Sequence, residues 1–143
     1  MQEDLHAIGR SCMALKARMA ARTVTRVYDA ALKPVGLRIT QFTVLACIGS
    51  GDVNSISGLA DYLAIERTTL TRNLQLLEKK GIISFEQGED SRARPVKLTE
   101  KGEELLQNAI PLWQDAQKTL QEKLGSDEWH MISSGLNILT KSA

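Results

Sequence analysis

The chain has 143 residues, of which 43% are apolar and 24% charged, and its formal net charge at pH 7 is +1. This composition is typical of a globular domain and excludes a strongly basic or acidic chain. No apolar run approaches the length of a membrane span, and the first ten residues lack the apolar centre of a signal peptide. We therefore expect a cytoplasmic protein with no membrane partner.

Charge is distributed unevenly along the chain. Residues 10–38 contain seven Lys or Arg against one Asp, whereas residues 103–143 contain six acidic residues against three lysines. Such a separation of charge is enough to orient a polyanion. The two cysteines, Cys12 and Cys47, form no CxxC motif, and a reducing compartment argues against a disulfide between them.

Residues 4–32 are predicted to form one long helix, which Pro34 and Gly36 end. Apolar residues recur along it at spacings of three and four, and a second set continues the pattern at another angle. These residues are Leu5, Ile8, Cys12, Leu15 and Met19, then Val24, Val27, Tyr28, Ala31 and Leu32. A helix with seams on more than one face usually packs against another subunit.

Two short helices are expected next. Thr40 is the predicted cap of a helix over residues 41–48, and Ser55 caps a third helix, after an extended piece at 53–56. A tight connection at 64–66 leads into residues 66–83, which read ERTTLTRNLQLLEKKGII. Two helices separated by so few residues are typical of a helix-turn-helix.

In that last stretch, Leu70, Leu74 and Leu77 form a stripe that faces a core, and Gly81 ends the helix. The opposite side carries donors and short hydroxyls and no acid: Arg67, Thr68, Thr71, Arg72, Gln75 and Lys79. Such a face suits the DNA major groove, where base edges offer acceptors and methyl groups and the phosphates attract cations. The alternative is an ordinary solvated face, which the order of the neighbouring elements makes less favoured.

A hairpin over residues 82–87 and 96–98 is expected to follow, with Asp90, Arg92 and Arg94 near its tip. An arginine on such a loop can enter a narrow minor groove, and a nearby carboxylate can orient it. The alternative is an exposed arginine pair without a function. Thr99 is then expected to cap a helix over residues 103–124, which Pro111 kinks or locally opens. A final helix carries Trp129, Ile132, Leu136 and Leu139 on one face.

Three segments carry a family resemblance: LRITQFTVL at 37–45, GLADYLAIERTTLTRNLQLLEKKGII at 58–83 and EDSRARPVKLTEKG at 89–102. They resemble the MarR family of bacterial winged-helix transcriptional regulators. The resemblance implies a mainly α fold with a small β-wing, a winged helix-turn-helix with N- and C-terminal dimerisation helices. It divides the chain into 1–36 and 101–143 for dimerisation and 37–100 for DNA binding. It also implies Asp90 and Arg92 as a wing pair, and Thr69, Thr71 and Arg72 as recognition-helix contacts.

Two kinds of regulatory site are expected from the residues and the resemblance. Many family members bind a small anionic or phenolic ligand near the junction of the dimerisation helices and the DNA-binding lobe. Arg18, Arg22, Arg26, Tyr28 and Trp113 are candidates here for an aromatic carboxylate. The alternative is that the arginines contact DNA phosphates or pair across a dimer.

Cys12 lies near Arg10 and Lys16, which would favour its thiolate, but a buried apolar cysteine is the more common case. The peroxide-sensing branch of the family has a Tyr four residues after its reactive Cys, and here Lys16 stands at that spacing. His6 and His130 alone do not make a metal site, and no cofactor is expected.

We therefore expect a homodimeric, sequence-specific DNA-binding regulator of a palindromic operator in double-stranded DNA. It would be a repressor relieved by an aromatic or phenolic anion or by an oxidant. The alternatives are a thiol-based redox sensor acting through Cys12 and a winged-helix module that binds proteins and not DNA. An enzyme is not expected, because the sequence has no Ser/His/Asp or Cys/His constellation, phosphate-binding Gly loop or metal-spaced cluster.

Overall fold

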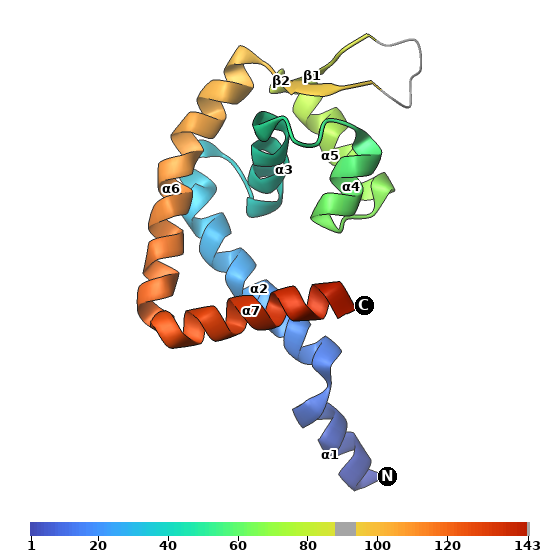
Figure 1. Ribbon diagram of the computed structural model, residues 1–143, viewed down its shortest axis with the longest axis vertical. Helices are drawn as coiled ribbons and strands as arrows, with labels where there is room; N and C mark the ends of the chain where they lie inside the picture. Colours follow the sequence, from blue (N-terminus) through green and yellow to red (C-terminus); the bar gives the residue numbers. More distant parts are fainter. Residues whose placement is uncertain (88–93, 143) are drawn as a thin grey trace.

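Residues 1–87 and 94–142 are described by a computed structural model (Figure 1). The elements in chain order are α1 (Gln2–Ser11), α2 (Met13–Leu32), the 3-10 helix η1 (Lys33–Val35), α3 (Ile39–Ser50), α4 (Ile56–Leu63), α5 (Arg67–Lys79), β1 (Ile83–Phe85), β2 (Val96–Leu98), α6 (Glu100–Leu124) and α7 (Ser126–Ser142). A lobe of α3, α4, α5 and the hairpin lies beside the long helices α2 and α6, whereas α1 projects away from it (Figure 1).

The lobe is built around the inward stripe of α5. Leu70, Leu74 and Leu77 are at most 1% exposed, and Leu45 and Leu59 from α3 and α4 are fully buried in the same cluster. Each such side chain removed from water contributes about 1.5–3 kcal/mol. The predicted orientation of α5 is confirmed, with its stripe in the core and its other side outward.

The helix-turn-helix has the predicted caps and a short turn. The Ser55 hydroxyl accepts a hydrogen bond from the Gly58 N–H at 3.1 Å, which fixes the start of α4. Ala64 ends α4 in the left-handed conformation, with φ of 52° and ψ of 42°. This residue turns the chain within three positions from α4 to α5, so it helps to set the angle between these two helices.

The wing is an antiparallel pair in which Ile83 lies opposite Leu98 and Phe85 opposite Val96. The Val96 N–H donates to the Asn54 carbonyl oxygen at 3.0 Å, so the predicted extended piece lies along the outer edge of β2. The Thr99 hydroxyl accepts from the Gly102 N–H at 3.1 Å and caps α6 as predicted. The molecule is thus mainly α with a small β-wing, a winged helix-turn-helix between terminal helices.

The first helix is not continuous, and this part of the prediction is wrong. Cys12 has an extended conformation, with ψ of 113°, and separates α1 from α2. Gly9 and Ser11 are weak helix formers, and the Ser11 hydroxyl donates to the Ala7 carbonyl at 2.6 Å, a contact that bends helices. No residue of α1 is buried, so packing within the chain does not oppose the break.

The predicted cap at Thr40 is also wrong: the helix expected over residues 41–48 is α3, and Thr40 lies inside it. That helix begins at Ile39, whose N–H donates to the Asp29 carboxylate at 2.8 Å, and the Arg38 N–H donates to the Gln41 side chain at 3.0 Å. The start of α3 is thus capped by the local Gln41 side chain together with a carboxylate from α2. The contact ties α2 to the lobe, and its partner lies too far along the chain for a local pattern to show it.

The terminal helices leave their apolar seams in solvent. In α1 and α2 the exposed residues include Leu5, Ile8, Met13, Leu15 and Met19, and in α7 they include Ile132, Leu136, Ile138 and Leu139. Helix α6 runs through Pro111 as one curved helix (Figure 1). Among the described residues no single helix has the length and apolarity to cross a membrane. Within residues 1–87 and 94–142, one pair of helices meets these criteria together, Met13–Val35 and Ile39–Ser50, and this pair is bent by 72°.

Candidate nucleic-acid interface

The outward side of α5 carries the candidate DNA contacts. The exposed predicted residues are Arg67, Thr68, Thr69, Arg72, Gln75 and Lys79. At 100° per residue, Thr68, Arg72, Gln75 and Lys79 fall opposite the buried leucines, and Arg67 falls toward one flank. The centre of this face holds two cations, an amide and a hydroxyl, a set that contacts both phosphates and base edges.

Thr71 differs from the other predicted contacts. It is half-buried at the flank of α5, and its hydroxyl donates to the Arg67 carbonyl oxygen at 2.8 Å. Since its hydroxyl proton is used within the helix, Thr71 offers a partner mainly an acceptor and a methyl group. At 100° per residue, the leucine stripe itself already places Thr71 on the flank of α5 and not opposite the core.

Leu76 belongs to the same surface and was missed by the sequence reasoning. It is 43% exposed and lies beside Arg72 on the side of α5 away from Thr71. The signal was available, because Leu76 falls outside the period of Leu70, Leu74 and Leu77. An exposed leucine on a groove-facing helix can contact the methyl group of thymine.

At the wing, Asp90 and Arg92 lie outside the described residues. Arg94 is exposed at the base of the tip, and its Nε donates to the Glu86 carbonyl oxygen at 3.3 Å. The Lys97 ammonium forms an ion pair with the Glu86 carboxylate across the two strands. Arg94 is therefore held to the backbone of Glu86, the residue that follows β1.

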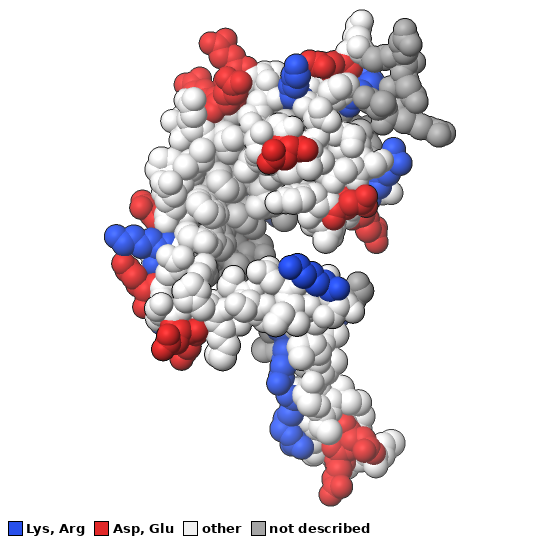
Figure 2. All heavy atoms as spheres, in the orientation of Figure 1, with Lys and Arg blue, Asp and Glu red and all other residues white. Residues whose placement is uncertain are grey.

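The predicted ligand residues are not brought together as one site. Arg18, Arg22 and Arg26 are exposed on α2, and Figure 2 shows basic side chains along its lower part. Tyr28 is buried, its hydroxyl donates to the Gln117 side-chain oxygen on α6, and burial raises the pKa of its phenol. Tyr28 thus joins α2 to α6 and is not open to a ligand.

Trp113 instead lies at a cavity between α3, α4 and α6. Its ring stacks on Phe42, with centroids 6.0 Å apart and planes at 20°. The cavity has a volume of about 530 Å³ and is lined by Phe42, Thr43, Ala46, Cys47, Ser50, Asp52, Val53, Tyr62, Leu63, Ile110 and Trp113. Its size suits a small organic molecule. The lining residues that the structure describes include none of the predicted arginines.

The thiols are placed differently. Cys12 is half-buried at the break between α1 and α2. Cys47 is buried beside the Trp113 cavity, and the pKa of its thiol is raised first by burial and then by the charge of Asp52. Burial and a nearby carboxylate both disfavour a thiolate, so Cys47 is the less reactive thiol for an oxidant that attacks thiolates.

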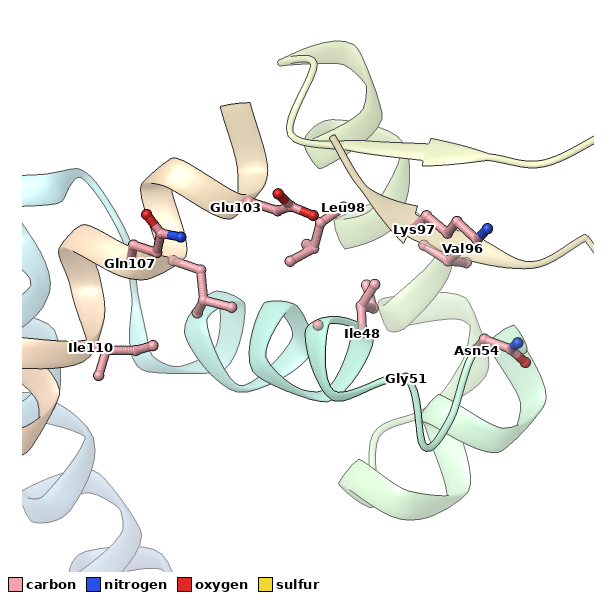
Figure 3. Close-up of a pocket in the computed structure, with 11 residues that line it drawn as sticks. Ile48, Gly51, Asn54, Val96, Lys97, Leu98, Glu103, Gln107 and Ile110 are labelled. Carbon is pink, nitrogen blue, oxygen red and sulfur yellow. The ribbon is translucent and has the colours of Figure 1, made fainter. Parts of the chain in front are cut away.

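A second hollow of about 550 Å³ lies where α3, β2 and α6 meet (Figure 3). Glu103 and Gln107 reach over it from α6, Asn54 lies at the far side, and Ile48 and Leu98 line its apolar part (Figure 3). The polar groups are spread around the rim and do not converge on one point. Among the described residues there is also no group of three or more His, Cys, Asp or Glu side chains that could hold a metal ion.

Comparisons with known proteins agree with this geometry. The model of the MarR family matches residues 37–93. The uncharacterized HTH-type transcriptional regulator YwoH of Bacillus subtilis is 33% identical over 84 residues. That match covers 59% of this chain, and the chain spans about three fifths (61%) of this relative.

Two solved structures, both of complexes with DNA, share the architecture. The transcriptional regulator MosR of M. tuberculosis, in complex with DNA, is 36% identical with a TM-score of 0.82, covering 92% of this chain and 96% of that one. A mutant MarR from E. coli complexed with operator DNA has the same TM-score of 0.82, covering 93% of this chain and 96% of that one. At 24% identity, the second likeness shows the fold alone.

The matched relatives are transcriptional regulators and not enzymes, as the sequence predicts. The motifs at 58–83, the fold with its wing, and the similarity to MosR over 92% of the chain all lead to one assignment. The chain belongs to the MarR family of winged helix-turn-helix proteins.

Proposed function

We propose that the chain is a homodimeric transcriptional regulator that binds a palindromic operator in double-stranded DNA, in the cytoplasm, and acts as a repressor. The observation that carries the proposal is the outward face of α5. Thr68, Arg72, Gln75 and Lys79 are all exposed there, while the opposite side of the helix is packed in the core. A rigid helix with this chemistry fits the major groove. The DNA in the MosR complex supports the same reading.

The contacts divide by chemistry. Gln75 has the amide that pairs in two places with adenine, and Arg72 has the guanidinium that pairs with guanine or with phosphate. Lys79, at the end of α5, is a phosphate contact, and Arg94 with Asp90 and Arg92 serves the minor groove beside it. Binding weakens as salt rises, since each phosphate contact releases counterions.

The dimer is proposed from the exposed seams of the terminal helices. Leu5, Ile8 and Met19 are each more than half exposed, and Leu136 is 52% exposed on α7. Side chains of this size repeated along one helix face favour a partner surface. A second copy of the same helices supplies such a surface and places two α5 helices on one duplex.

The dimer is tested by sedimentation equilibrium of the wild type, Leu136→Glu and Tyr62→Ser. Tyr62 is 72% exposed on α4, outside the terminal helices, and serves as the matched control. We expect a dimer for the wild type and Tyr62→Ser and a shift to monomer for Leu136→Glu. A wild type that stays monomeric at micromolar concentration contradicts the proposal.

DNA binding is tested by selecting duplexes from a random pool with the purified protein. Enrichment of a palindrome supports the proposal, and its half-sites should lie about one helical turn apart. The variant Arg72→Ala should lose enrichment of that palindrome, whereas Arg18→Ala, an exposed arginine on α2, should retain it. No enriched sequence from a folded dimer contradicts sequence-specific binding and favours the protein-interaction alternative.

Regulation is proposed to act through a small molecule in the Trp113 cavity. This cavity touches α3, α4 and α6, so a bound molecule contacts both the helix-turn-helix and the long helix beside it. A ligand that prefers one separation of these elements shifts the population of lobes that fit the operator. Oxidation at Cys12 stays an alternative, tested by the operator affinity of Cys12→Ser with and without peroxide.

A further inference from the structure

The charge of the residues that line the Trp113 cavity differs from that of the predicted anion site, which was based on the arginines of α2. Asp52 is the one charged residue among the lining residues that the structure describes, and it is exposed at the rim. None of the ion pairs found among residues 1–87 and 94–142 involves Asp52. The carboxylate is therefore available to a molecule that enters the cavity.

Aromatic groups line the same space. The stacked rings of Phe42 and Trp113 come from α3 and α6, and Tyr62 of α4 is 72% exposed at the opening. The face of each ring carries negative charge density, which attracts a cation within about 6 Å of its centre. An aromatic lining with a single carboxylate repels anions and suits an organic cation.

We propose that this cavity takes a small organic cation with an apolar body, such as an aromatic quaternary ammonium compound. The cationic centre lies near Asp52 and Tyr62, and the apolar body lies against Phe42, Trp113 and Ile110. The proposal deepens the ligand-relieved regulation proposed above and rests on it. It replaces the aromatic carboxylate that the sequence led us to expect.

The field of Asp52 reaches the cavity wall. Besides burial, its charge is the second cause that raises the pKa of the Cys47 thiol, whose residue lines the same space. A carboxylate that disfavours an anionic sulfur also disfavours a bound carboxylate and favours a bound ammonium. The polar neighbours, Thr43 and Ser50, carry no charge and adapt to either sign.

The test uses two probes with one shape. In 3-hydroxyphenyltrimethylammonium a positive nitrogen stands where 3-tert-butylphenol has a carbon, and salicylate provides the anion. Binding is measured by calorimetry on the full chain and by Trp113 fluorescence in the variant Trp129→Phe, since the chain has two tryptophans. We expect the cation to bind about five- to tenfold more tightly than its neutral isostere, and salicylate more weakly than both.

Two variants locate the effect. Asp52→Asn keeps the shape of the side chain and should weaken the cation about threefold without changing the neutral isostere. Tyr62→Leu should also weaken the cation more than the isostere, because it keeps an apolar group and removes the ring. The control is Asp61→Asn, an exposed carboxylate on α4 that does not line the cavity, and it should change nothing.

Equal binding of the cation and its isostere, tighter binding of salicylate, or no binding of any probe would overturn the proposal. An equal loss in Asp52→Asn and Asp61→Asn would overturn it as well, since only the overall charge would then matter. These measurements contain no DNA. If no probe binds as expected but an operator is still selected, only the cavity proposal fails. If no operator is selected but the cation still binds, only the DNA-binding proposal fails.

Discussion

A Cβ atom at Gly102 would lie 2.1 Å from the carbonyl oxygen of Ile82, so the backbones of α6 and the start of the wing touch at this point. The same carbonyl accepts the Thr99 N–H at 3.0 Å. The wing and the end of α5 are thereby fixed to the long helix.

Gly102→Ala is expected to lower the free energy of unfolding by about 2 kcal/mol, since the Ile82 carbonyl must move and cannot do so cheaply. Urea unfolding followed by circular dichroism measures this loss. The matched variant is Gly58→Ala, whose new Cβ would meet side-chain atoms of Val53 and Ser55 at 2.8 and 2.9 Å. Side chains move more easily than backbone, so a smaller loss is expected; equal losses would show that the backbone contact is not limiting.

The turn between α4 and α5 stores strain at Ala64, where φ is 52°. Ala64→Gly should raise the free energy of unfolding by about 0.5–1 kcal/mol, because glycine adopts this conformation without a clash. Ala64→Val should lower it, since a β-branched residue fits this region worst. Thermal unfolding of the three proteins gives the order, and a Gly variant less stable than the wild type would argue against strain at this turn.

Base preference should depend on Gln75 more than on Thr71. Gln75 is exposed on the outward face of α5, whereas the Thr71 hydroxyl donates to the Arg67 carbonyl. Gln75→Ala should cost about 1–3 kcal/mol at one base position and relax selection there. Thr71→Val keeps the methyl group and should leave the preferred base unchanged. The base preference is measured by duplex selection with each variant. A preference that changes in Thr71→Val and not in Gln75→Ala would show that Thr71, and not Gln75, determines it.

Tyr28 should make stability depend on alkaline pH. Its folded pKa is raised above 10.0 by burial, so its contribution to stability is complete below pH 10 and is lost as the pH rises through the folded pKa. Tyr28→Phe should lower the unfolding free energy by about 1 kcal/mol at pH 7, because Gln117 loses a donor. It should also flatten the decline above pH 10. Tyr62→Phe, an exposed control, should do neither.

The features of this fold that depend on contacts between neighbouring residues could be predicted from the sequence. The stripe of Leu70, Leu74 and Leu77 and the caps at Ser55 and Thr99 depend on neighbours within a few residues, and each was predicted and is present. The break at Cys12 was not predicted. A periodic apolar pattern continues through it, whereas Gly9, Ser11 and the Ser11 hydroxyl bond to the Ala7 carbonyl weaken the helix there.

The sites that depend on distant residues were predicted less well. The contact of Asp29 with Ile39 and the stacking of Trp113 on Phe42 join separate elements, and no spacing rule brings them together. The arginines of α2 and Trp113 were predicted to form one ligand site, because both were expected near the junction of the dimerisation helices and the DNA-binding lobe. In the fold, Trp113 and Asp52 line one cavity instead, which changes the sign of charge at that cavity.

In the proposed complex, two copies of the chain bind one duplex through their α5 helices. Sedimentation velocity with the selected duplex, labelled and titrated at several salt concentrations, measures how many chains bind each duplex. We predict two chains on each duplex and an affinity that falls steeply with salt, with the slope reduced by about one in Lys79→Ala. One chain per duplex, or an affinity that Lys79→Ala and added salt leave unchanged, would rule out this mode of binding.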